Sequence, residues 1–75
     1  RVLKEGIVSM DVAQNIHVVK KVSGMAMAVA AAIDAMKLKE IVGSIAGDDT
    51  IMMALRSEKA AIETMENIKN IMEES

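Results

Sequence analysis

The chain has 75 residues, of which 52% are hydrophobic and 27% charged, and its formal net charge at pH 7 is −2. This balance is typical of a folded domain and excludes a disordered segment, which has fewer apolar residues and more net charge. The longest uncharged run, residues 22–33, is too short for a membrane-spanning helix of about 20 residues, and no signal peptide is recognisable. We therefore expect no membrane partner. The absence of cysteine agrees with a cytoplasmic protein.

The chain also lacks Phe, Tyr and Trp, and it contains eight methionines. A domain of this size buries only about 60% of its unfolded surface, and such domains usually depend on disulfides, a metal or a partner subunit. Since the chain has no cysteine and one histidine, the sequence favours a partner subunit and predicts a homo-oligomer. The first residue is Arg rather than Met, which predicts a fragment or one domain of a longer chain.

Two alternating segments, residues 3–13 and 16–22, predict a β-hairpin with its turn at Gln14-Asn15. In the first segment, the alternation assigns one face to Val8, Met10 and Val12. In the second segment, it separates His17 from its neighbours Ile16 and Val18. The strand is expected to end in solvent at Lys20 and Lys21.

Residues 25–38 predict a helix that is apolar on nearly every side, with Ser23 as its N-cap. One stripe of this helix is expected to cover the sheet, and it consists of Met25, Val29, Ile33 and Met36. A second stripe is expected to contact another subunit, and it consists of Met27, Ala30, Ala31 and Asp34.

Two further strands, residues 41–46 and 51–55, are expected around a turn at 47–50, and a helix is expected over residues 58–74 with Ser57 as its cap. The expected buried stripe of this helix is Ile62, Met65, Ile68 and Met72. Its expected solvent face is Glu63, Glu66, Asn67, Asn70 and Glu73. The order ββαββα predicts a single α+β domain over residues 1–75, a two-layer fold with both helices on one face of a four-stranded antiparallel sheet.

The chemically most informative segment is the turn that contains Asp48 and Asp49. Two adjacent carboxylates repel each other unless a cation lies between them, although Gly and Asp are also common in solvated turns. His17 has no second His or Cys at metal-ligand spacing, and no nucleophile–base pair or phosphate loop is recognisable. We therefore expect no catalytic residues, no metal and no cofactor.

The segment Ile45-Ala46-Gly47-Asp48-Asp49-Thr50-Ile51 closely resembles the signature of the C-terminal domain of bacterial arginine repressors. Upstream, Ser23-Gly24-Met25-Ala26-Met27 followed by Asp34 resembles the Pro-Gly-x-Ala-Gln element of this family and the acidic residue after it. The resemblance covers essentially the whole chain. It implies a DCoH-like fold and an oligomerisation and arginine-binding domain. In such a protein, a winged helix-turn-helix domain outside this chain binds operator DNA.

The resemblance also implies trimers that stack into hexamers, with L-arginine bound as corepressor between the trimers. The arginine-binding positions that it implies are Lys20, Met27, Asp34, Ser44, Ala46, Asp48 and Asp49. Two residues depart from the family pattern, because Ser23 replaces Pro and Met27 replaces Gln. Met27 cannot hydrogen-bond to the α-amino or α-carboxylate group of arginine. A paralogue that trimerises but does not sense arginine is therefore an alternative. An enzyme similar to the pterin dehydratase of the same architecture is a further alternative, and it would require clustered histidines.

A physical argument supports a role of the two aspartates in binding arginine. Guanidinium is planar, permanently charged and rich in donors, so carboxylates bind it in a fork. Consecutive side chains in extended backbone point to opposite sides, so Asp48 and Asp49 can serve different subunits. With a net charge of −2 and no basic cluster, this chain itself is not expected to contact DNA.

Overall fold

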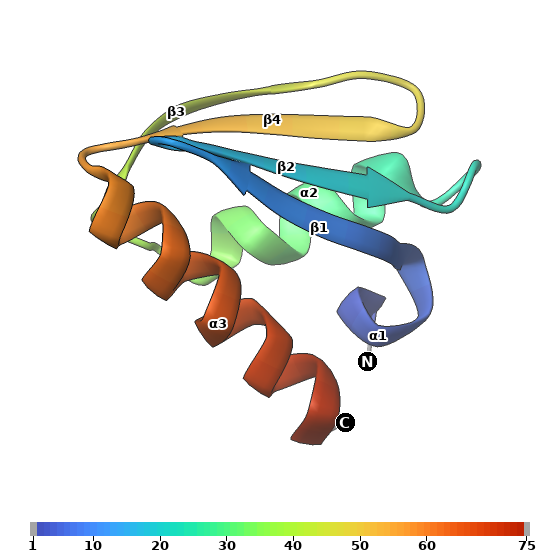
Figure 1. Cartoon of the computed structure of the whole chain (residues 1–75). Coiled ribbons are helices and arrows are strands. Elements are labelled where there is room, and N and C mark those ends of the chain that lie inside the picture. The colour runs from blue at the N-terminus through green and yellow to red at the C-terminus, as the bar shows by residue number, and fades with distance from the viewer. Residues whose placement is uncertain (1, 75) are drawn as a thin grey trace.

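Three helices cover one face of a four-stranded sheet in the computed structural model, which describes residues 2–74 (Figure 1). The elements are α1 (Val2–Gly6), β1 (Ile7–Ala13), β2 (Ile16–Lys21), α2 (Ala26–Ala35), β3 (Ile41–Ala46), β4 (Thr50–Leu55) and α3 (Glu58–Glu74). The strand order is β1-β2-β4-β3, and all neighbours are antiparallel. The two-layer α+β fold expected from the sequence is confirmed, with α1 as an additional element.

A single hydrophobic core lies between the sheet and the helices. Val19 of β2 lies opposite Ile51 of β4, and both side chains are buried. From the helices, α2 contributes Val29 and Ile33, and α3 contributes Ile68. Every second residue of the central strands faces the helices because successive side chains of a strand alternate between its two faces. The sheet-covering stripe predicted for α2 is confirmed, since Met25 and Met36 also pack against this core.

The N-terminal residues form a helix where the sequence pattern predicts the beginning of a strand. In α1, Leu3 is buried in the core, and the Gly6 carbonyl accepts a hydrogen bond of 2.7 Å from the Val22 amide. A Cβ atom on Gly6 would collide with the Val29 side chain, so this glycine permits α1 to pack against α2. A helix of five residues is marginal by itself, and these tertiary contacts explain why it forms.

The first hairpin confirms the predicted turn, and it confirms the predicted faces of β1 except at Val8. The turn lies at Gln14-Asn15, where Gln14 has a φ of 54°. A bulge between Ile7 and Ser9 shifts the register of β1, and Val8 is consequently 66% exposed. By contrast, Met10 and Val12 pack against the core.

In β2, the predicted separation of His17 from Ile16 and Val18 is confirmed. His17, Val19 and Lys21 lie on the covered face, whereas Ile16 and Val18 are half-buried on the other. His17 is 0% exposed and Lys21 is 3% exposed, so the expectation that the strand ends in solvent is wrong for Lys21. Apolar residues occur on both faces of β2, so the alternation alone does not specify which face the helices cover.

Helix α2 is shorter than predicted. Met25 occupies its N-cap position without a side-chain hydrogen bond, so the prediction of Ser23 as the N-cap is wrong. Gly24, with a φ of 91°, reverses the chain direction before the helix. At the other end, Lys37 has a φ of 54°, and this left-handed conformation ends the helix before Leu38.

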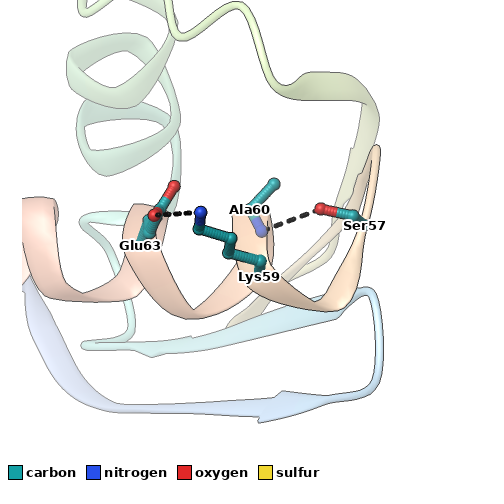
Figure 2. Close-up of polar contacts among 4 residues, drawn as sticks. All are labelled: Ser57, Lys59, Ala60 and Glu63. Carbon is teal, nitrogen blue, oxygen red and sulfur yellow. Dashed lines mark hydrogen bonds and ion pairs between the residues drawn. The ribbon is translucent and has the colours of Figure 1, made fainter.

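Helix α3 begins as predicted. The Ala60 amide donates a hydrogen bond of 3.0 Å to Ser57 Oγ, as Figure 2 shows, which confirms Ser57 as the cap. Lys59 Nζ lies 4.0 Å from Glu63 Oε2, and both side chains are exposed. The same figure draws this ion pair. Such an exposed pair contributes little to stability.

The buried side of α3 agrees with the predicted stripe at Ile68, with Met72 packed against the core, and departs from it at Ile62. It consists of Ala60, Ala61, Thr64 and Ile68, with Met65 half-buried beside it. Ile62 is 47% exposed, because it lies about 100° around the helix from the buried Ala61. The polar residues predicted to face water are all exposed: Glu63, Glu66, Asn67, Asn70 and Glu73.

Candidate functional site

Asp48 and Asp49 lie in the exposed turn that joins β3 to β4. The Gly47 amide closes this turn by donating a hydrogen bond of 2.7 Å to the Thr50 carbonyl. The Thr50 hydroxyl donates to Asp49 Oδ1 at 2.9 Å. The Asp48 carboxylate accepts no hydrogen bond from any of residues 2–74.

An open groove of about 390 Å³ separates α2 from the end of β3. Its lining residues are Ala26, Met27, Ala30, Ala31, Asp34, Ala46 and Gly47. The small alanine side chains on this face of α2 leave the space, and Met27 is 87% exposed. The groove therefore unites Met27, Asp34 and Ala46 with the residue that begins the aspartate turn.

Four of the seven expected ligand-binding residues do not line this groove. Asp48 and Asp49 directly follow its lining residue Gly47, whereas Lys20 and Ser44 line other hollows. Lys20 lines a hollow on the uncovered face of the sheet, together with Asp11 and Val18. Its Nζ donates to Thr50 Oγ1 at 3.2 Å, so Lys20 is linked to Asp49 through the Thr50 hydroxyl. Ser44 lines a third hollow with Gly43, Ile45 and Met52. Within one chain, the groove therefore lies on the face of the sheet that the helices cover, and the Lys20 side chain lies on the uncovered face.

The sequence reasoning missed Lys21 as a residue of this region. Its Nζ donates to the Gly47 carbonyl at 3.1 Å and to the Ala26 carbonyl at 3.5 Å. Both acceptors belong to residues that line the groove. The available signal is the period-two spacing of His17, Val19 and Lys21, which places all three on the covered face of β2.

His17 lies in the core and not in the groove. Neither of its ring nitrogens has a hydrogen-bond partner among residues 2–74. Burial disfavours the charged imidazolium and lowers the pKa of His17 below 6.5. A fully buried imidazole cannot contact a substrate, so the single histidine of this chain does not provide the clustered, accessible histidines that the enzyme alternative requires.

Residues 2–74 contain neither a metal-binding cluster of side chains nor a helix that could span a membrane. No group of three or more His, Cys, Asp or Glu side chains is placed to hold a metal ion. No helix in this part of the chain is long and apolar enough to cross a membrane.

The chain matches known proteins over nearly its whole length. Residues 3–70 match the family described as "Arginine repressor, C-terminal domain". A curated relative named "Arginine repressor" from Lachnospira eligens is 62% identical over 71 residues, which are 95% of this chain and 47% of the relative. A relative of the same name from Lachnoclostridium phytofermentans is 58% identical, and the match covers 96% of this chain and 47% of the relative. Another from Acetivibrio thermocellus is 53% identical, and the match covers 93% of this chain and 46% of the relative. The chain thus spans about half the length of the curated relatives it matches.

The four-stranded antiparallel sheet covered by helices on one face defines a small α+β domain. The chain belongs to the family of arginine repressor C-terminal domains. This confirms the resemblance seen in the sequence and the DCoH-like fold that it implies. The relatives are named as repressors and not as enzymes, so the dehydratase alternative is withdrawn.

Proposed function

We propose that this chain, residues 1–75, is the L-arginine-sensing oligomerisation domain of a transcriptional repressor of arginine metabolism genes. The observation that carries the proposal is the groove that unites Met27, Asp34 and Ala46 beside the Asp48-Asp49 turn. Family membership supports the ligand, since the relatives are named arginine repressors. Such a regulator acts in the cytoplasm, where bacterial operator DNA lies.

The charge of the groove suits a guanidinium group. Asp34, Asp48 and Asp49 are all exposed carboxylates in or next to the groove. A guanidinium has five donors in a planar fork and remains charged at every physiological pH. A hydrogen bond between charged groups contributes about 1.5–3 kcal/mol, so two or three such contacts are enough for selective binding.

The domain forms trimers, and two trimers stack into a hexamer with L-arginine at the junction. Large apolar side chains remain exposed on single subunits, and Ile45 and Met52 are neighbours on the uncovered face of the sheet. Burying such side chains against another subunit adds to the small core of this chain. Lys20 and Ser44, which lie outside the groove, contribute to arginine binding from a neighbouring subunit.

Arginine strengthens the assembly by mass action, because a ligand that binds the hexamer better than the trimer shifts the equilibrium toward the hexamer. An arrangement that brings several aspartate pairs together is repulsive when empty, and a cation relieves this repulsion. The hexamer then presents the winged helix-turn-helix domains, which lie outside this chain, to operator DNA.

A second candidate function rests on Met27, which is 87% exposed in the groove. Its thioether offers no strong hydrogen bond to an amino acid backbone. In this alternative, the domain is a trimerising paralogue that does not respond to arginine. The two candidates differ in one measurable property, which is the dependence of assembly on arginine.

Sedimentation velocity with and without L-arginine tests the proposal, and interference optics detect this chain without Trp or Tyr. A shift from trimer to hexamer, or a tighter hexamer, supports arginine sensing. An oligomer that does not respond to arginine supports the paralogue, and a stable monomer contradicts both candidates. In a second arm, the Asp48→Asn/Asp49→Asn double variant is expected to lose the arginine response, and an undiminished response would refute the role of the aspartate pair.

A further inference from the structure

We infer that Lys21 is a positioning residue, whose buried ammonium holds the Gly47–Asp49 turn against the start of α2 and so presents the aspartate pair to the ligand. The inference deepens the proposed function and rests on it for the identity of the ligand. Lys21 does not need to touch the ligand. It acts through the backbone carbonyls of Gly47 and Ala26.

The contacts of Lys21 join three parts of the chain that are distant in sequence. Its own amide donates to the Asp49 carbonyl at 2.8 Å. Its Nζ donates to the Gly47 carbonyl at 3.1 Å, on the same turn, and to the Ala26 carbonyl at 3.5 Å, at the first residue of α2. One residue thus binds both ends of the aspartate turn and also the opposite wall of the groove.

The burial of Lys21 makes this arrangement specific. The side chain is 3% exposed, and its ammonium forms no ion pair with a carboxylate among residues 2–74. A lysine is seldom buried without a charged partner, and the removal of an ammonium from water is unfavourable. The two carbonyl oxygens partly offset this penalty, because charge-assisted hydrogen bonds are stronger than neutral ones. A residue kept for stability alone would be better replaced by an apolar side chain.

Both carbonyl acceptors lie at the groove. Ala26 lines it from α2, and Gly47 lines it from the end of β3. The bonds of Lys21 therefore set the separation of the two walls at the end of the groove next to Asp48. On the uncovered face, Lys20 supports the same turn through Thr50, so consecutive lysines hold it from both sides of the sheet.

The test uses the full protein with the variant Lys21→Met, which retains an unbranched apolar stem and removes the donors. Lys39→Met is the matched control, because Lys39 is an exposed lysine outside the groove. Hydrogen exchange of the Gly47 amide, which donates to Thr50, reports on closure of the turn without any ligand. The dissociation constant for L-arginine reports on the groove, and the melting temperature reports on global stability.

In Lys21→Met, we expect the Gly47 amide to exchange about tenfold faster and arginine to bind about tenfold more weakly. The melting temperature is expected to stay the same or rise, because a buried unpaired charge has been removed. Lys21→Gln retains N–H donors on a side chain shorter by one bond, and it is expected to lie between Lys21→Met and the parent. The control Lys39→Met is expected to match the parent in exchange and affinity.

Three results would overturn the inference. The first is unchanged Gly47 exchange in Lys21→Met. The second is faster exchange throughout β2 and β4 with a lower melting temperature, which would assign Lys21 a purely structural role. The third is faster Gly47 exchange with unchanged affinity in a protein that binds arginine. If the parent binds no arginine while Gly47 exchange rises selectively, the proposed ligand is wrong and the role of Lys21 in holding the turn stands.

Discussion

His17 and Met53 lie opposite each other on β2 and β4, and both side chains are at most 1% exposed beneath the helices. The imidazole therefore occupies an apolar position of the core, and neither ring nitrogen has a hydrogen-bond partner among the described residues. The neutral form fits this position, whereas the imidazolium would be a buried charge without compensation. Protonation of His17 is consequently coupled to unfolding.

The first prediction is a loss of stability on mild acidification. Burial lowers the pKa of His17 in the folded protein below the value of 6.5 that it has when unfolded, so the unfolded chain binds the proton first. The free energy of unfolding should be constant above about pH 7.5 and should fall as the pH decreases through 6.5, by at most about 1.4 kcal/mol per pH unit. Urea unfolding followed by far-ultraviolet circular dichroism between about pH 5.5 and 7.5 measures this fall in the free energy of unfolding.

The variant His17→Met is the control for this pH dependence. An apolar side chain of similar size removes the only histidine and should give a stability that is flat over the same range. At about pH 5.5, the variant should be more stable than the parent. An equal pH dependence in the two proteins would show that another group is responsible.

The second prediction concerns the two isoleucines of α3 that the sequence places in one stripe. Ile68 is 0% exposed and Ile62 is 47% exposed. Ile68→Ala should lower the free energy of unfolding by about 2–5 kcal/mol because it leaves a cavity in the core. Ile62→Ala should lower it by less than about 1 kcal/mol. Chemical denaturation measures the free energy of unfolding of both variants. A similar decrease of this free energy in each would mean that another subunit covers Ile62.

The third prediction is that Met27→Gln strengthens arginine binding. The side chain is exposed in the groove, so the substitution should change stability by less than about 0.5 kcal/mol. One added hydrogen bond to the ligand contributes about 0.5–1.5 kcal/mol, which corresponds to an affinity gain of up to about tenfold. Isothermal titration calorimetry measures the gain. Met27→Leu is the matched control without hydrogen-bonding capacity, and an equal affinity in all three proteins would argue against a ligand contact at this position.

The fourth prediction concerns ligand selectivity. If the aspartates bind a guanidinium group, L-lysine should bind at least about tenfold more weakly than L-arginine. The reason is that an ammonium cannot form the pair of parallel hydrogen bonds that a guanidinium forms with a carboxylate. L-citrulline lacks the charge and should bind more weakly still. Competition against labelled arginine gives the order directly. Equal affinities for the three amino acids would refute the guanidinium assignment.

The candidate site was only partly predictable from the sequence. The resemblance of the Ile45–Ile51 segment to a known signature identified Asp48 and Asp49, and the upstream element identified Met27 and Asp34. The sequence does not indicate the burial of Lys21, because a lysine at the end of a strand is normally solvated. Its role depends on carbonyl groups of Ala26 and Gly47, and their approach is a property of the folded chain.

By itself, the sequence determined the order of strands and long helices, the turn at Gln14-Asn15 and the cap at Ser57. These features follow from local chemistry, in which turn residues, capping hydroxyls and apolar periodicity act within a few residues. It also identified the family, because a signature segment is a property of the residues themselves.

The tertiary structure alone decided which face of β2 is covered, and with it the burial of His17 and Lys21. Both faces of that strand carry apolar side chains, so the choice depends on where the helices pack. The helical form of α1 likewise depends on its contact with α2 through Gly6, since so short a helix lacks intrinsic stability. The groove exists for the same reason, because its two walls are brought together by the packing of α2 beside β3.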